Sequence, residues 1–394
     1  MGRKILWHSC APWVPTGYGS QTALFAPRIA DLGYDVACSA FFGLAGSQLN
    51  WTAPSGRAIP VYPAGQDGHS NDVMGSHLRH WAGEEPSLFL SLTDVWVLWT
   101  DVVKRLPAAA WVPVDHDPAP PEVVEWFERG AAVPIAMSRF GQERLRDAEL
   151  DPLYVPHGYD PAVFYPRERA EARARLGFPQ DAFVVGVVAA NVGAPSRKGF
   201  SQALEAFARF AERAPDARLY MHTNLRSVTG ENLARMVESV GVVPLVVHQY
   251  RYSLGLPSSY VADVMSACDV LLNPSHGEGF GIPILEAMAC GTPAIATDFS
   301  SMPELVGDSG WLVGGQRTWT AFNSWQMIAN VEEIVDALVR ARDEPEADRA
   351  ARRERCLERA SWYAADRVLA ESWAPALEEA CRRVDFRRQT PVEP

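Results

Sequence analysis

The feature that most restricts the possible folds is a regular alternation of short apolar runs with longer amphipathic segments. This alternation is typical of β-α units, in which parallel strands are joined by crossover helices. In the first half the pattern predicts strands at residues 4–7, 35–40, 87–92, 110–114 and 133–137, and helices at 20–32 and 139–148. In the second half it predicts strands at 183–190, 218–222, 244–247, 270–273 and 294–297, a helix at 200–214 and a helical stretch at 346–383. Residues 42–83 are rich in Gly, Pro, Ser and Asn, and the pattern assigns them no element.

A connector separates the two sets of β-α units. Residues 154–166 contain three prolines and a glycine, which interrupt regular structure. A length of 394 residues also suits two domains. We therefore expect an α/β chain with two facing Rossmann-like domains, parallel sheets and a cleft between them that binds ligand at the carboxyl ends of the strands. The expected domains are 1–158, 159–370 and a terminal helix, 371–394, that packs back toward the first domain.

Charge and composition argue against several classes of partner. The formal net charge is −12, whereas nucleic-acid binders and proteins anchored on anionic membranes usually present a basic face. No apolar run is long enough to span a bilayer, and the first residues do not resemble a signal peptide. The six cysteines are scattered, which predicts reduced thiols and no metal site. We expect a cytoplasmic protein of unassigned oligomeric state.

The densest pattern lies in residues 273–297, which read as strand, Gly-rich loop, helix, Gly-Thr-Pro break and strand. Gly279 and Gly281 would let the backbone approach a ligand closely, and a helix starting near Ile282 would offer unpaired N–H groups to an anion. Glu278 and Glu286 could both face that ligand, since carboxylates accept hydrogen bonds from sugar or ribose hydroxyls. The structural alternative is an ordinary β-α turn with Glu286 as a favourable charge near a helix start.

These residues resemble the donor-binding signature of retaining family 4 glycosyltransferases, which have the GT-B fold. Residues 157–166 resemble that family's interdomain connector, 191–200 its phosphate loop, 300–307 its following helix and, more loosely, 16–22 its N-terminal glycine loop. The resemblance implies that Glu278 binds hydroxyls of the transferred sugar and Glu286 binds the ribose. It also implies that the backbone of Gly279, Phe280 and Gly281 contacts the sugar and the diphosphate.

Departure of a nucleoside diphosphate builds negative charge, which cations and helix N-termini can stabilise without a metal. Arg197 and Lys198 stand between a predicted strand and a predicted helix, and Lys198 is one of only three lysines in the chain. The family usually places an arginine just after this strand, where the present sequence has Asn191, so either Asn191 or Arg197 fills that role. The structural alternative for the pair is a solvated basic turn. We expect the nucleotide base near Tyr250 and Arg251.

The first domain offers weaker signals. Gly17 and Gly19 precede the first predicted helix and could approach the donor phosphate or the acceptor. Asp115 and His116 follow a predicted strand, and the family commonly has a histidine here that touches the donor sugar. Two other interpretations stay open: a D-x-D metal motif of the single-domain GT-A transferases, or a surface turn. Trp13, in the glycine loop, could stack on a sugar, while the aromatic segment 311–330 could be a lid, an acceptor wall or packing.

The sequence thus predicts a metal-independent, retaining hexosyltransferase without a cofactor. Its donor would be a UDP- or GDP-sugar and its acceptor an unidentified hydroxyl on a small molecule, a glycan or a protein, with the leaving phosphate taking the proton. Three alternatives remain: a GT-B sugar-nucleotide epimerase, a non-catalytic nucleotide-sugar-binding protein, and a glycoside hydrolase, which also uses paired carboxylates.

Overall fold

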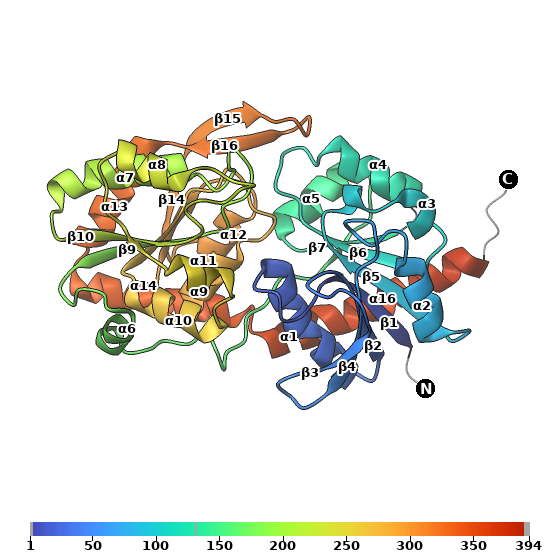
Figure 1. Ribbon diagram of the computed structural model, residues 1–394. Coiled ribbons are helices and arrows are strands. Elements are labelled where there is room, and N and C mark those ends of the chain that lie inside the picture. The colour runs from blue at the N-terminus through green and yellow to red at the C-terminus, as the bar shows by residue number, and fades with distance from the viewer. Residues whose placement is uncertain (1–2, 131, 390–394) are drawn as a thin grey trace. The chain divides into compact units, whose positions relative to one another are not determined.

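The computed structural model describes residues 3–130 and 132–389, which form two compact units (Figure 1). Unit 1 consists of Met1–Gly158, Phe322–Ser324 and Ala365–Pro394, and unit 2 of Tyr159–Ala321 and Trp325–Ala364. The first division follows Gly158. The terminal segment starts at Ala365 rather than at residue 371 and belongs to unit 1, and residues 390–394 of it lie outside the described part of the chain.

Unit 1 is built on an eight-stranded sheet with the order β3-β4-β2-β1-β5-β6-β7-β8. Neighbouring strands are parallel, except that β3 is antiparallel to β4. The strands are β1 Lys4–Cys10, β2 Asp35–Phe42, β3 Leu49–Thr52, β4 Ala58–Tyr62, β5 Ser87–Leu92, β6 Ala108–Val112, β7 Val133–Ala136 and β8 Leu153–Tyr154. The helices are α1 Gly17–Asp31, α2 Met74–Ala82, α3 Thr100–Val103, α4 Pro121–Gly130, α5 Arg139–Asp147, α15 Ala365–Val368 and α16 Ala374–Gln389, with short turns η1 Val95–Val97 and η2 Leu369–Trp373.

Two expectations for unit 1 need correction. Helix α1 starts at Gly17 rather than at residue 20, because the Thr16 hydroxyl accepts a hydrogen bond from the Gly19 N–H (3.1 Å) and caps the helix there. Gly17 and Gly19 are thus residues of the first helical turn, not of a preceding loop. The unassigned residues 42–83 contain β3, β4 and α2. Strand β3 has only four residues and is largely exposed, and the five residues of β4 include Pro60 within a short apolar run, so neither strand shows a clear hydrophobic alternation.

Buried aromatic rings tie the terminal segment to the sheet of unit 1. The Trp373 ring lies 5.6 Å from that of Trp7 on β1 and 4.8 Å from that of Trp111 on β6. All three side chains are fully buried, and large rings packed edge to face contribute strongly to a core. The segment after Ala365 therefore completes the core of unit 1.

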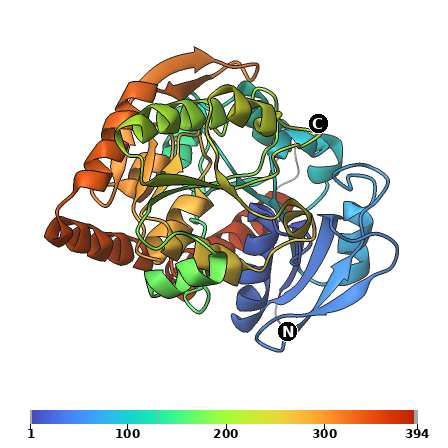
Figure 2. The same cartoon turned by 60° about the vertical axis from the view of Figure 1, so that its left-hand side comes forward.

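Unit 2 contains a six-stranded, wholly parallel sheet with the order β11-β10-β9-β12-β13-β14 and a separate antiparallel hairpin, β15-β16. Figure 2 shows helices on both sides of this sheet. The strands are β9 Phe183–Val188, β10 Ala217–His222, β11 Leu245–Val246, β12 Val270–Asn273, β13 Ala294–Thr297, β14 Trp311–Val313, β15 Gly315–Trp319 and β16 Trp325–Ala329. The helices are α6 Arg169–Leu176, α7 Phe200–Arg213, α8 Leu233–Ser239, α9 Gln249–Ser253, α10 Ser258–Ala267, α11 Ile282–Ala289, α12 Met302–Val306, α13 Val331–Asp343 and α14 Glu346–Ser361.

Each large sheet has one point at which the strand order reverses. In unit 2, β9 lies between β10 and β12, and in unit 1, β1 lies between β2 and β5. Successive connections leave such a strand in opposite directions, so a crevice opens outside the carboxyl ends, where open α/β sheets bind ligands. The fold therefore directs attention to the loops after β9 and β12 in unit 2 and after β1 and β5 in unit 1.

Over the described part of the chain, no helix combines the length and the apolar character needed to cross a membrane.

Candidate functional site

The loops after β9 and β12 are fixed to each other at the reversal point of unit 2. The His276 N–H donates to the Arg197 carbonyl (2.7 Å), and the Met327 N–H of β16 donates to the His276 carbonyl (3.0 Å). Gly199 has a positive φ of 66°, and a Cβ on it would lie 2.1 Å from the Pro274 carbonyl oxygen. Only glycine fits there, so the two loops hold a fixed relative position.

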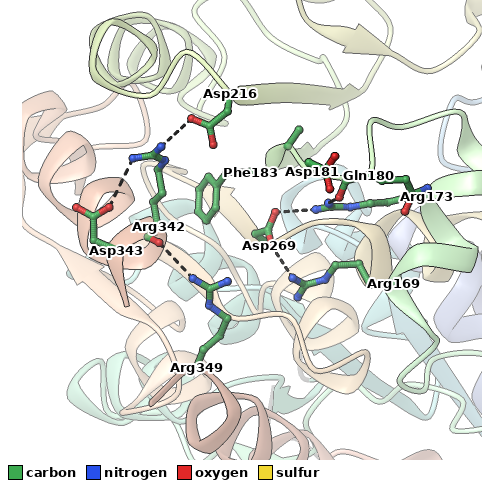
Figure 3. Close-up of a pocket in the computed structure, with 11 residues that line it drawn as sticks. Arg169, Arg173, Gln180, Asp181, Phe183, Asp216, Asp269, Arg342, Asp343 and Arg349 are labelled. Atoms are coloured by element: carbon green, nitrogen blue, oxygen red, sulfur yellow. Dashed lines mark hydrogen bonds and ion pairs between the residues drawn. The ribbon is translucent and has the colours of Figure 1, made fainter. Parts of the chain in front are cut away.

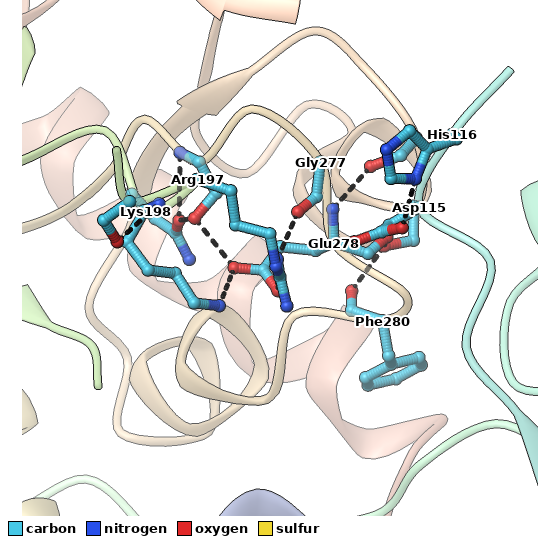
Figure 4. Close-up of polar contacts among 12 residues, drawn as sticks. Asp115, His116, Arg197, Lys198, Gly277, Glu278 and Phe280 are labelled. Carbon is cyan, nitrogen blue, oxygen red and sulfur yellow. Dashed lines mark hydrogen bonds and ion pairs between the residues drawn. The ribbon is translucent and has the colours of Figure 1, made fainter. Parts of the chain in front are cut away.

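Glu278 lies at the centre of these two loops and is only 6% exposed. The Lys198 ammonium lies 2.6 Å from its Oε1 atom, and the Arg197 guanidinium lies 3.0 Å from its Oε2 atom (Figure 4). The Ser275 hydroxyl lies 2.7 Å from Oε1 as well. The structure thus brings together three side chains that the sequence predicted as one group, Glu278, Lys198 and Arg197, and adds Ser275, which sequence reasoning missed.

The electrostatics of this group favour an anionic ligand. Burial opposes ionisation of Glu278, but the nearby Lys198 and Arg197 charges outweigh it and hold the pKa of the carboxyl at about 2. Glu278 is therefore ionised at neutral pH. Two cations and this carboxylate lie together beside the backbone of the two loops, an arrangement that suits a phosphate.

Two serines after β13 fix the backbone around Glu278. The Glu278 N–H donates to Ser300 Oγ (2.9 Å), and the buried Ser301 hydroxyl lies 2.7 Å from the Glu278 carbonyl and 2.8 Å from the Phe280 carbonyl. Sequence reasoning gave these serines no role. Their position directly after β13, the strand beside β12, was the available signal, because carboxyl ends of adjacent parallel strands meet at one edge.

Two helices start at this edge without a side-chain cap. Helix α7 follows Gly199, and helix α11 follows Gly281, which has a positive φ of 106°. The first N–H groups of a helix lack intrahelical partners, and with the helix dipole they favour an anion. Ile282 is the first residue of α11, as predicted, and Gly279 and Phe280 lie in the loop before it.

Glu286 stands one turn into α11. Its carboxyl group has no hydrogen-bond or ion-pair partner among the described residues, and burial raises its pKa to about 8. A carboxyl group that is partly buried and unpaired is costly, and hydroxyl donors from a ligand would satisfy it. Its environment differs sharply from that of Glu278, although the two lie in one signature.

Asn191 is occupied by its own unit. Its amide nitrogen donates both hydrogens to carbonyls, those of Asn224 (2.9 Å) and Glu231 (2.7 Å), and its oxygen accepts from the Glu231 N–H (2.9 Å). No amide hydrogen is left for a phosphate. Of the two residues considered for the phosphate arginine, Arg197 is therefore the one whose position suits it.

Tyr250 and Arg251 lie on α9. Among the described residues, neither side chain forms a hydrogen bond or an ion pair with Glu278. Tyr250 is exposed, and the Arg251 guanidinium lies 5.7 Å from the centre of the Tyr260 ring. Their predicted contact with a nucleotide base stays a prediction.

In unit 1, Asp115 and His116 follow β6 and form a pair, with His116 Nδ1 2.6 Å from Asp115 Oδ1. His116 is 4% exposed, and its Nε2 atom has no hydrogen-bond partner in the described structure. In the neutral tautomer that donates Nδ1–H to this carboxylate, Nε2 carries a lone pair that can accept a hydrogen bond. Asp117, the second acid of the possible D-x-D motif, pairs with Arg144 (3.1 Å).

A cavity of about 550 Å³ lies elsewhere in unit 2 (Figure 3). Its lining includes Asp269, which precedes β12 and so marks the amino edge of the sheet, opposite to Glu278. Asp269 pairs with Arg169 (2.6 Å) and Arg173 (2.8 Å), and Arg342 pairs with Asp216 (2.7 Å). These arginines are engaged in ion pairs, and Arg173 also donates to the carbonyls of Ala267 and Gln180, so the lining of the cavity is a structural ion-pair network.

Comparison with known proteins identifies the second half of the chain. Residues 183–340 match the family model for glycosyl transferases group 1. This part of the chain belongs to that glycosyltransferase family. The matched range contains Lys198, Glu278 and Glu286, and the predicted family resemblance is confirmed for residues 183–340.

Relatives match over part of their length. A D-inositol 3-phosphate glycosyltransferase of Acidothermus cellulolyticus is 33% identical over 181 residues, which are 43% of this chain and 39% of the relative. An alpha-maltose-1-phosphate synthase of Mycolicibacterium smegmatis is 32% identical over 258 residues, 61% of this chain and 63% of the relative. The chain thus spans between about two fifths and two thirds of the length of these glycosyltransferase relatives.

Solved structures of the same fold cover the whole chain. A sucrose-phosphate synthase from Thermosynechococcus elongatus superposes with a TM-score of 0.72 at 18% identity over 98% of both chains. Anabaena HepE in complex with UDP-glucose gives 0.69 at 18% identity, over 95% of this chain and 99% of that one. The predicted fold class, GT-B with two Rossmann-like domains, is confirmed, which leaves the GT-A reading of Asp115 and Asp117 without support.

Proposed function

We propose that this glycosyltransferase moves a hexose from a UDP- or GDP-sugar to an acceptor hydroxyl with retention of anomeric configuration. The observation that carries the proposal is the buried Glu278 carboxylate, bridged by Lys198 and Arg197 beside two uncapped helix starts. Such a group binds a sugar and a diphosphate side by side. HepE, a structural neighbour, was solved with UDP-glucose, which supports a nucleotide-sugar donor here.

Each charged residue has a distinct task in the donor complex. The diphosphate recruits Lys198 and Arg197, both of which contact the Glu278 carboxylate in the absence of donor. Glu278 then accepts hydrogen bonds from hydroxyls of the transferred sugar, and Glu286 accepts them from the ribose. The N–H groups at the start of α11 contribute further donors to the diphosphate.

In the reaction the acceptor oxygen forms a bond to the anomeric carbon on the face from which the diphosphate departs. The bond between that carbon and the phosphate oxygen breaks, and the acceptor proton passes to the leaving phosphate oxygen. Lys198 and Arg197 stabilise the charge that develops on the phosphate, a contribution that fixed charges make effectively because they need no rearrangement. In this proposal no side chain forms a covalent intermediate, and the two cations take the place of a metal ion.

The test is thermal stabilisation of the protein by a panel of UDP- and GDP-sugars in the presence of EDTA, since a ligand of the native state raises the melting temperature. One nucleotide series should raise it, Glu286→Ala should abolish the rise, and Lys198→Met should reduce it. Lys104→Met, which removes an exposed lysine of unit 1 that pairs with Asp101, is the matched control and should respond like wild type. Absence of stabilisation by every nucleotide sugar, or full binding in Lys198→Met, would contradict the donor site.

Product analysis separates the remaining classes. Retention predicts that NMR of the glycosylated product shows the donor's anomeric configuration. Release of free nucleotide and a rearranged sugar without any acceptor would identify an epimerase. Binding without turnover would identify a sensor, and cleavage of glycosides without nucleotide would identify a hydrolase.

A further inference from the structure

The second reversal point lies in unit 1, between β1 and β5. The loops that leave the carboxyl ends of these strands are residues 11–16 and 93–99. They carry Trp13, Trp96 and Trp99, which are 41%, 37% and 52% exposed. Exposed indoles are costly in water, so three of them flanking the expected ligand crevice of a sheet indicate a surface that a ligand covers.

The loop that carries two of these indoles is held rigidly. Asn71 accepts a hydrogen bond from the Trp99 N–H (2.7 Å) and donates one to the Val97 carbonyl (3.0 Å), and the buried Trp126 indole donates to the Leu98 carbonyl (2.7 Å). Three consecutive residues of the backbone are therefore fixed while the rings of Trp96 and Trp99 stay exposed. A backbone that is already fixed lowers the entropy lost when a ligand stacks on these two rings.

The same edge of unit 1 is acidic. The loops that reach it from β1, β2, β4, β5 and β6 are residues 11–16, 43–48, 63–73, 93–99 and 113–120, and their sequences contain no lysine and no arginine. They contain aspartates at 67, 72, 94, 115 and 117. A phosphate monoester carries a charge of about −1.5 to −2 at neutral pH, and such a group would meet repulsion here.

Among the arginines that follow β7, Arg144 offsets one of these five aspartates. The Arg139 guanidinium lies 3.6 Å from the centre of the Tyr154 ring and donates to Gln142 (2.9 Å). Arg144 pairs with Asp117 (3.1 Å) and Asp147 (2.8 Å). Both cations are thus engaged within α5 and its neighbours.

A polar group adjoins the aromatic surface. The Phe322 ring lies 5.3 Å from that of Trp96 and 5.4 Å from that of His116. His116 Nε2 is the buried atom without a partner in the described structure, and it is able to accept a hydrogen bond from a hydroxyl. A ligand with a flat C–H face and hydroxyl groups matches this combination, since aromatic faces stack on sugar rings and polar atoms at the side fix their orientation.

We infer that the acceptor is an uncharged saccharide, free of phosphate, that stacks on Trp96 and Trp99 at the carboxyl edge of the unit 1 sheet. This inference rests on the proposed transferase function and adds its acceptor class. It separates this chain from relatives whose names include a phosphorylated compound, such as D-inositol 3-phosphate or alpha-maltose-1-phosphate. The indoles supply the binding area and the acidic loops exclude anionic acceptors.

The experiment measures nucleotide release with the donor found by thermal stabilisation and a panel of acceptors: methyl hexosides and maltose-type oligosaccharides, the corresponding hexose phosphates and inositol phosphate, and Ser/Thr peptides. Uncharged saccharides should stimulate release, and hexose phosphates should not. Trp96→Ala and Trp99→Ala should each lower kcat/KM for the saccharide about 10- to 100-fold, mainly through KM, as loss of a buried aromatic contact does. Trp96→Phe and Trp99→Phe should recover most of it.

Trp362→Ala is the control, because this tryptophan is comparably exposed (48%) but lies in unit 2. It should leave the acceptor KM unchanged, and all variants should keep the wild-type donor-induced rise in melting temperature. Preferred transfer to a phosphorylated sugar, transfer to peptides alone, no transfer to any saccharide, or wild-type kinetics in both Trp→Ala variants would overturn the inference. A protein that neither binds nor turns over any donor would instead refute the proposed function.

Discussion

The Lys198 ammonium lies 2.6 Å from the Oε1 atom of Glu278, a carboxylate that is almost entirely buried. Burying a carboxylate is costly unless it is paired, so without donor the lysine stabilises a group whose proposed partner is the sugar. Donor binding would exchange this contact for two others, from lysine to diphosphate and from glutamate to sugar hydroxyls. The catalytic charges are thus kept in position before the donor arrives.

Replacement of Lys198 by methionine should lower kcat by about 10²- to 10³-fold, because loss of one preorganised charge at a developing anion has effects of this size. Lys198→Arg should recover only part of the activity, since a planar guanidinium does not reproduce a compact ammonium 2.6 Å from Glu278. Steady-state nucleotide release at saturating donor measures the kcat of both variants. Lys104→Met should keep wild-type kcat, and an equally active Lys198→Met would remove Lys198 from the mechanism.

The close approach of Gly199 to Pro274 makes a second prediction. Gly199→Ala should destabilise the protein and abolish donor-induced stabilisation, because the new Cβ meets the Pro274 carbonyl at 2.1 Å and forces the two site loops apart. Gly241→Ala is the matched control: its φ of 70° is similarly positive, but no atom lies within 4 Å of the added Cβ. Gly241→Ala should lower the free energy of unfolding by only about 1–2 kcal/mol, the cost of a left-handed backbone at alanine, and should keep donor binding. Chemical denaturation and thermal shifts compare the two, and equal behaviour would show that the approach is unimportant.

The sequence predicted the parts of the fold and site that follow from local pattern. Strands β5, β12 and β13 lie where the apolar runs placed them, and Lys198 and Glu278 belong to motifs with their own glycines. It could not assign Asn191, whose role depends on carbonyls at Asn224 and Glu231, 33 and 40 residues away.

The helix start at Gly17 was missed for a different reason. A single hydroxyl cap by Thr16 outweighed the glycines that suggested a loop. Ser301 was missed because a serine after a strand has no distinctive local pattern. Its function arises only where β13 lies beside β12.

Ser301→Ala should loosen the loop around Glu278, since the hydroxyl holds the carbonyls of Glu278 and Phe280. A loss of about 1–3 kcal/mol in the free energy of unfolding is expected for leaving buried carbonyls unpaired. Ser309→Ala removes a comparably buried hydroxyl that donates to the Val306 carbonyl (2.7 Å), away from the signature loop. Both variants should lose stability, but only Ser301→Ala should weaken donor binding, measured by calorimetry. Equal donor affinity in the two would contradict a positioning role for Ser301.

Glu286 makes the protein sensitive to pH in two opposite ways. Burial raises its pKa from 4.5 to about 8, so without donor the folded protein holds a proton that the unfolded chain has lost at neutral pH. The free energy of unfolding of the wild type, relative to Glu286→Gln, should therefore fall as pH rises from about 4.5 to about 8 and level off above it. Urea titrations of both proteins across this range measure the difference.

Donor affinity should change in the other direction. In the proposed donor complex the ribose hydroxyls bind best to an ionised Glu286, so ionisation of a group with a pKa of about 8 has to accompany donor binding. The Kd of the donor should decrease as pH rises from 6.5 to 8.5 in wild type, and should change less in Glu286→Gln, where a neutral amide takes the same position at every pH. Calorimetry in two buffers of different ionisation enthalpy should also detect proton release on binding to wild type at pH 7. Parallel pH profiles for the two proteins, or binding without proton release, would mean that Glu286 is not the ribose ligand.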